Sequence, residues 1–222
     1  MFSLFRDAQQ LENVETQLVG MLETCSRMFE LAVGALMRTS DPAAVADEIF
    51  ALDKELNRTE REIRRELLVH GSVWGAEVDY GLMLAYMSVA KDVERVGDYC
   101  KNLWNLADLG VDFSAGPDQA EIQEHFRRVA ELVVITTEVF RDQKESAVHQ
   151  LIPEIENDEK HYDDLMAEFI RSDQPGTFAA PRAILYRYIK RISAHLSNLL
   201  TSLVMPVDRL DFYKKSKAID SE

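Results

Sequence analysis

The chain has 222 residues, 46% of them hydrophobic, and its 39 acidic and 25 basic side chains give a formal net charge of −14. Its 9 glycines and 6 prolines are few for this length, which argues against a turn-rich β-sandwich and against a disordered chain. The negative charge repels phosphate backbones and anionic lipid headgroups, so nucleic-acid binding and general membrane binding are disfavoured. Cations and basic protein surfaces are the partners that this charge suits.

The sequence shows no targeting or membrane-spanning segment. The first residues have no basic flank leading into a sustained apolar stretch, and no stretch approaches the roughly 20 apolar residues of a membrane span. Cys25 and Cys100 both lie in apolar periodic stretches, which is typical of buried free thiols. These features predict a cytoplasmic protein without direct membrane insertion.

Apolar residues in the first half of the chain recur with the spacing of three helices. The first helix is predicted over residues 11–35. Ser40-Asp41-Pro42 is a good start for the second, because an acidic N-cap precedes proline at the first helical position. We expect His70-Gly71-Ser72 to end that helix, and residues 82–107 to form the third.

The same pattern returns after a break at residues 108–118, the only internal stretch that looks like a domain junction. Helices are predicted over residues 122–140, 155–169 and 185–203, with a loop over 172–181 before the last. No strand-like alternation is sustained anywhere in the sequence. The sequence therefore predicts an all-α protein.

The repeated order predicts six long helices that form two tandem three-helix bundles. The first bundle is expected to span residues 1–112 and the second residues 113–213. Residues 214–222 read as a polar tail.

Two carboxylates on the third helix are the most informative polar feature. Glu94 and Asp98 are four residues apart, so they share one helix face. Gly97 lies near the apolar seam, where it costs about 1 kcal/mol of helix propensity. Close approach of a neighbouring helix is one reason to accept that cost, so the pair is expected where two helices nearly touch.

Two other helices carry acidic positions of the same kind. Asp53, Asn57 and Glu60 follow one stripe of the second helix, and Glu159 and Asp163 repeat the four-residue spacing on the fifth. Hard cations prefer several carboxylate oxygens drawn from more than one element. A solvated charged face is the alternative interpretation of the same pattern.

At these positions the chain resembles the PhoU family of phosphate-uptake regulators. The matching segments of the first half are Leu52-Asp53-Lys54-Glu55-Leu56-Asn57 and Lys91-Asp92-Val93-Glu94-Arg95-Val96-Gly97-Asp98-Tyr99. Those of the second half are Glu159-Lys160-His161-Tyr162-Asp163-Asp164-Leu165 and Arg191-Ile192-Ser193-Ala194-His195. The likeness extends over nearly the whole chain in helix number and order.

The resemblance implies tandem three-helix bundles and carboxylates that hold iron or zinc clusters on the bundle surface. It also implies a regulatory role, in which the protein restrains phosphate uptake and two-component signalling by contacting a sensor histidine kinase and a phosphate transporter. Such contacts would bring it to the inner face of the membrane through its partners.

The match is better in the first half than in the second. Glu94, Asp98 and Asp53 fit, whereas Asn57 stands where the family usually has aspartate. In the later motif, lysine and alanine stand in the two acidic positions, at residues 190 and 194. The resemblance therefore implies at most one competent metal site, formed by Asp53, Asn57, Glu60, Glu94 and Asp98, with Glu159, Asp163 and His195 as weaker second-half candidates.

The remaining acid–histidine pairs and His161 are better explained as ordinary surface or partly buried residues than as metal ligands. Glu66/His70, Glu121/His125 and Glu145/His149 are Glu-x-x-x-His pairs, whereas ferritin-like di-iron sites need Glu-x-x-His on two helices. His161 points away from Asp163 on its helix. The sequence also lacks a glycine-rich phosphate loop and a nucleophile elbow.

The leading hypothesis is therefore a non-enzymatic, metal-associated adaptor that acts through protein contacts. One alternative is a carboxylate-bridged metalloenzyme, a phosphohydrolase or an oxidase, that uses Asp53, Glu60, Glu94 and Asp98. Another is a helical adaptor without metal. Shared cations between acidic faces also suggest a homodimer.

Overall fold

The computed structural model describes residues 8–74 and 78–210, and over these residues it contains six long α-helices, one short 3-10 helix and no strand. The predicted all-α fold of two three-helix halves is confirmed. The first three helices are α1 (Ala8–Leu36), α2 (Pro42–Trp74) and α3 (Tyr80–Asp108). The last three are α4 (Gln119–Arg141), α5 (Glu145–Arg171) and α6 (Gly176–Thr201), followed by η2 (Val207–Arg209). The predicted polar tail at 214–222 lies outside the described residues.

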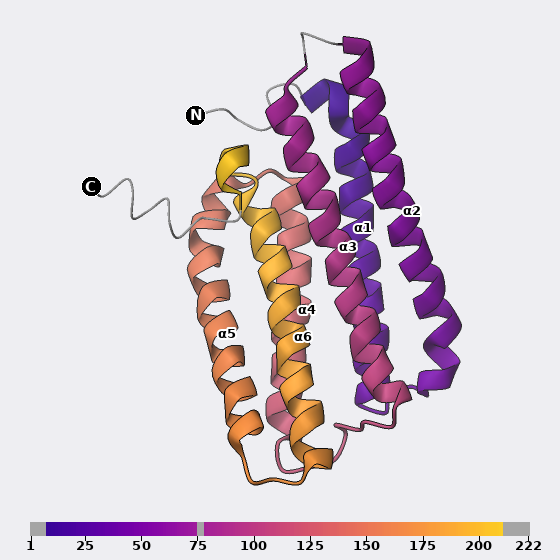
Figure 1. Cartoon of the computed structure of the whole chain (residues 1–222), viewed down its shortest axis with the longest axis vertical. Helices are drawn as coiled ribbons and strands as arrows, with labels where there is room; N and C mark the ends of the chain where they lie inside the picture. Colours follow the sequence, from indigo (N-terminus) through magenta and orange to yellow (C-terminus); the bar gives the residue numbers. More distant parts are fainter. Residues whose placement is uncertain (1–7, 75–77, 211–222) are drawn as a thin grey trace, which may run out of the picture.

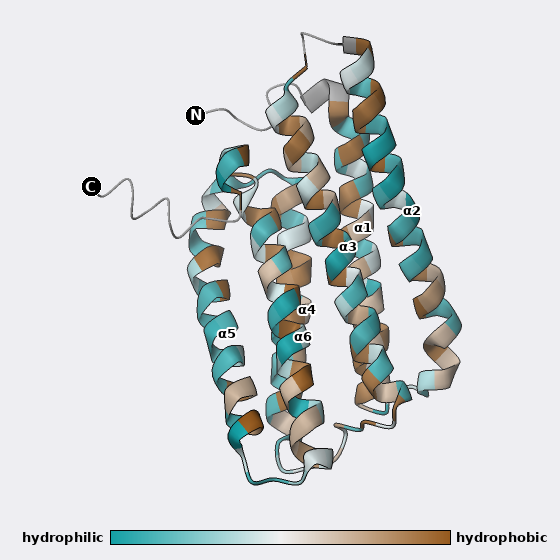
Figure 2. Ribbon diagram, in the orientation of Figure 1, coloured by the Kyte–Doolittle hydropathy of each residue, from teal (hydrophilic) through white to brown (hydrophobic). Residues whose placement is uncertain are grey.

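Four helices form the centre of the molecule. α1 packs on α3 and α4, and α6 packs on α3 and α4, so each half contributes two helices to the middle (Figure 1). α2 covers one side, against α1 and α3, and α5 covers the other, chiefly against α6. The two flanking helices are mostly hydrophilic along their middle turns (Figure 2).

One hydrophobic core runs through both halves. Fully buried residues of α1, α3 and α6, among them Leu18, Val93 and Leu196, belong to a single cluster that also includes residues of α4. Cys25 and Cys100 are free and buried in it, as predicted, and burial raises the pKa of both thiols. Neither thiol is therefore ionised at neutral pH.

Residues of both halves contact the segment that connects α3 to α4. The N–H of Phe113 donates to the carbonyl of Leu36 at 2.9 Å, and its buried ring lies under the Arg182 guanidinium of α6, 5.5 Å from the ring centroid. Arg38 at the end of α1 donates to the carbonyl of Val111 at 3.1 Å. The predicted boundary at residues 112/113 falls inside this connection.

A local signal explains the start of α2, but several predicted helix ends are wrong. The helix predicted from residue 155 begins at Glu145, so that Pro153 lies inside α5. α2 begins at Pro42 with Asp41 accepting from the N–H of Ala43, as the sequence predicts. However, it continues past Gly71 to Trp74, and α6 begins at Gly176, inside the predicted loop at 172–181. Glycine is tolerated within a helix when packing stabilises it, and Gly71 lies where an added Cβ would meet Met83 of α3 at 3.1 Å.

Along the part of the chain that the structure describes, no helix has the length and apolar character needed to cross a bilayer.

Candidate functional site

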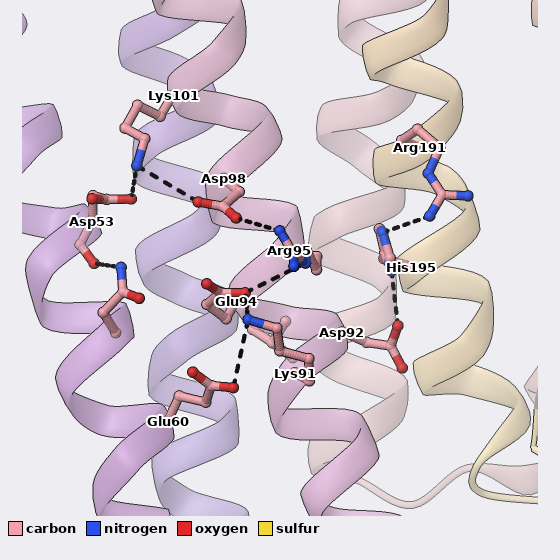
Figure 3. A network of polar contacts seen from close by, with 12 residues as sticks. Asp53, Glu60, Lys91, Asp92, Glu94, Arg95, Asp98, Lys101, Arg191 and His195 are labelled. Atoms are coloured by element: carbon pink, nitrogen blue, oxygen red, sulfur yellow. Dashed lines mark hydrogen bonds and ion pairs between the residues drawn. The ribbon is translucent and has the colours of Figure 1, made fainter.

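Gly97 brings α2 against α3 at the level of the acidic motif. A Cβ on Gly97 would overlap Cδ1 of Leu56, which is itself only 2% exposed. The prediction that this glycine marks a close helix approach is confirmed. The carboxylates on either side of the contact, from α2 and α3, thereby belong to one polar network between the two helices (Figure 3).

Glu60 and Glu94 form the more buried half of this polar network. They are 4% and 6% exposed, and the Lys91 ammonium lies between them, 3.8 Å from Glu60 Oε1 and 2.6 Å from Glu94 Oε2 (Figure 3). Arg64 pairs with Glu60 at 2.7 Å from the outer side. Buried carboxylates need such partners, because an unpaired buried charge is strongly unfavourable.

Asp53 and Asp98 form the second half of the network, with Lys101 between them. The ammonium lies 2.5 Å from Asp53 Oδ1 and 3.6 Å from Asp98 Oδ1, and Arg95 reaches the other oxygen of Asp98 at 3.0 Å. Partial burial acts to lower the pKa of Lys101, but the hydrogen bond and charge of Asp53 and the charge of Asp98 outweigh it and raise that pKa. Asn57 donates to the Asp53 carbonyl at 2.8 Å.

The network is balanced in charge. Four carboxylates from α2 and α3 face two lysines and two arginines, and each carboxylate pair that joins the helices is bridged by an ammonium group. A metal ion at this face would have to displace a lysine. As placed, these donors are paired with lysine and arginine side chains, and metal binding here stays a prediction.

The second-half candidates are dispersed. Asp163 of α5 is paired with Lys190 of α6, the lysine that stands in an acidic position of the motif. His195 uses both ring nitrogens elsewhere: Nδ1 lies 2.8 Å from Asp92 Oδ1 of α3, and Nε2 lies 3.1 Å from Arg191 (Figure 3). Glu159 does not belong to any cluster of metal-ligating side chains among the described residues. His195 thus connects the two halves of the molecule.

Sequence reasoning missed a different group of donors. Within residues 8–74 and 78–210, the one set of three side chains that converges with metal-ligand spacing is Glu121 and His125 of α4 with His161 of α5. One donor atom from each lies within 4.8 Å of the others. The i, i+4 spacing of Glu121 and His125 was a usable signal, since it places both side chains on one face of α4.

Comparison with known proteins supports the resemblance found in the sequence. The PhoU domain model matches residues 18–107, which span the motifs of α2 and α3. The crystal structure of PhoU from Pseudomonas aeruginosa is similar over 91% of this chain and 97% of that one, with a TM-score of 0.76 and 19% sequence identity. No curated protein sequence matches the chain. Residues 18–107 thus match the PhoU domain, and the chain as a whole has the fold of PhoU.

Proposed function

We propose that the protein is a non-enzymatic regulator of phosphate uptake and phosphate-dependent signalling, acting as an adaptor on a phosphate transporter, a sensor histidine kinase or both. The observation that carries the proposal is the coincidence of the PhoU domain match with the polar network of α2 and α3. Binding to such partners would hold the protein at the inner face of the membrane.

The network offers a surface suited to protein contacts. Lys91 and Arg95 are 38% and 49% exposed at the side chain, while the carboxylates beneath them are largely buried. Charged groups arranged in this way favour partner choice and association rate more than raw affinity. A partner with complementary charges would therefore recognise this face without any catalytic step.

The proposal is tested in the native organism by deleting the gene and measuring phosphate uptake and a phosphate-starvation reporter in phosphate-replete medium. Deletion is expected to raise phosphate uptake and reporter expression, and the wild-type gene is expected to return both to the wild-type level. Arg95→Glu should restore neither, because it reverses a charge on the proposed contact face. Arg127→Glu on α4 is the matched control, since Arg127 is similarly exposed and also pairs with acids of its own helix.

Two results would contradict the adaptor role. One is unchanged uptake and reporter expression in the deletion strain. The other is a failure of the wild-type protein to co-purify with a phosphate transporter or a sensor kinase from phosphate-replete cells. A known membrane-protein complex recovered from the same preparation would show that the purification worked.

The metal-associated part of the proposal concerns iron or zinc at Asp53, Asn57, Glu60, Glu94 and Asp98. Elemental analysis of protein purified without chelator or metal-affinity resin tests it, with Glu94→Ala/Asp98→Ala as the comparison. Stoichiometric metal that disappears in the variant would support a site at this face. A homodimer through shared cations at these acidic positions is tested on the same samples by light scattering, as a change in mass on adding metal.

A further inference from the structure

A cluster of metal-ligating side chains lies between α4 and α5, away from the network of α2 and α3. Glu121 and His125 project from successive turns of α4, and His161 projects from α5. One ligand atom of each lies within 4.8 Å of the other two. We propose that these three residues bind a divalent transition-metal ion, zinc being the first candidate.

The spacing of the three donors is close to what zinc needs. His125 Nε2 lies 3.7 Å from Glu121 Oε1. Zinc bonds of about 2.0–2.2 Å in a tetrahedron place neighbouring ligand atoms about 3.3–3.6 Å apart. Glu121 and His161 are exposed side chains, so they can close the remaining gap by rotation while the buried His125 stays in place.

The buried donor atom makes no hydrogen bond among the residues that the structure describes. His125 is 8% exposed, and its Nε2 is buried without a hydrogen-bond partner. Its ring is fixed by edge contacts with Tyr162 and Tyr186, whose centroids lie 5.4 and 5.5 Å away. A buried polar atom left unpaired is unfavourable, and a metal bond at Nε2 removes that cost.

The chemistry of the donors selects the class of metal. Two imidazoles and one carboxylate form a ligand set that suits zinc and its neighbours, with a fourth position left for water. Burial, and next the charge of His161, lower the pKa of His125, although Glu121 and Asp158 act in the opposite direction. The neutral imidazole, which is the ligating form, is therefore favoured at pH 7.

The ion would join two helices that otherwise meet only lightly. α5 packs chiefly on α6, and its backbone stays far from most of α4. Arg128 of α4 pairs with Asp158 of α5 at 2.5 Å. The proposed site lies one helical turn from this pair, because His125 precedes Arg128 by three residues and His161 follows Asp158 by three. Metal binding would thus add a second cross-link between α4 and α5.

Calorimetric titration of the chelator-treated full chain, without a polyhistidine tag, tests the proposal with zinc chloride. We expect one equivalent of zinc to bind at this cluster, in addition to any metal held at the α2–α3 face, and the Tm to rise. His161→Gln should weaken this binding at least tenfold and abolish the rise in Tm. Because His161 is exposed, this variant should keep the helical circular dichroism of the metal-free wild type. Co²⁺ in place of Zn²⁺ should give visible absorption bands that are lost in the same variant.

His149→Gln is the matched control, since it removes one imidazole from the same helix outside the cluster, and it should bind zinc as the wild type does. Unchanged zinc affinity in His161→Gln, or no stoichiometric binding to the wild type, would overturn the proposal. So would binding that is lost in Glu94→Gln/Asp98→Asn and kept in His161→Gln, because that result assigns the ion to the α2–α3 face.

Discussion

The side chain of Leu56 on α2 occupies the space that any side chain at Gly97 of α3 would need. This contact lies at the centre of the acidic motif and sets the distance between the two helices. It also accounts for a glycine in the middle of a helix, where that residue is about 1 kcal/mol less favourable than alanine.

Gly97→Ala is expected to lower the free energy of unfolding by about 1–2 kcal/mol. Overpacking a buried contact costs roughly 1–3 kcal/mol, and the better helix propensity of alanine offsets only part of it. Urea unfolding followed by circular dichroism measures the change. Shortening the partner should relieve the clash, so Gly97→Ala should cost less in a Leu56→Ala background than in the wild type.

Gly20→Ala on α1 is the matched control. Among the described residues, no heavy atom outside its own helix lies within 4 Å of a Cβ built there, so only the gain in helix propensity remains. The variant should be more stable than wild type by about 0.5–1 kcal/mol. Equal losses in Gly97→Ala and Gly20→Ala would show that packing against Leu56 is not the cause.

The helices were predictable because their apolar residues recur at three and four residues, which is a local property of the sequence. Several helix ends were not predictable, among them the end of α2 and the start of α6, because tertiary packing decided them. Gly71 stays helical against Met83, and α6 starts early enough for helical bonds from Phe178 and Ala179 to the carbonyl of Pro175. Proline at position 181 is thus accommodated within α6, near its start.

The candidate site was predictable in part for the same reason. Spacing along one helix placed Glu94 and Asp98 on a shared face, but it did not show that Lys91 and Lys101 would bridge to α2. The cluster at Glu121, His125 and His161 depends on the register of α4 against α5. That register is set by contacts between residues far apart in the chain, which a single sequence does not reveal.

Lys91→Met is expected to destabilise the protein by about 1–3 kcal/mol, because it removes the cation between two buried carboxylates. The loss should be smaller than the roughly 3–5 kcal/mol typical of a broken buried pair, since Arg64 and Arg95 remain near Glu60 and Glu94. Urea unfolding at pH 7 gives the value. Arg58→Met removes a cation from an exposed pair of α2 and should change stability by less than about 0.5 kcal/mol.

Arg182→Met is expected to be the more damaging substitution, at about 3–5 kcal/mol. The guanidinium is buried, donates to both oxygens of Asp118 at 2.5 and 2.7 Å, and lies 3.5 Å from the centroid of the Phe178 ring. Arg182→Lys keeps the charge but loses the paired donors and the planar stacking, so it should recover only a fraction of the loss. Full recovery by lysine would mean that charge alone matters. Thermal unfolding of the three proteins distinguishes these outcomes.

The same ion pair should make stability depend on pH in acid. The hydrogen bond and charge of Arg182 hold the pKa of Asp118 below its ordinary value, although partial burial acts to raise it. In the acidic range the unfolded chain therefore binds a proton that the native protein does not, and stability rises with pH there. The contribution of Asp118 is fully present above the ordinary aspartate pKa of 3.8 and is lost as pH falls through the native value.

Asp118→Asn tests this dependence, because it keeps the shape of the side chain and removes the titration. The stability difference between wild type and Asp118→Asn should be large at pH 7, stay nearly constant down to about pH 4, and shrink as the pH is lowered further, measured by urea unfolding at each pH. Asp47→Asn, at an exposed position of α2, is the control and should leave the pH profile of the wild type unchanged. A difference that stays constant below about pH 4 as well would mean that the ionised carboxylate of Asp118 is not what Arg182 stabilises.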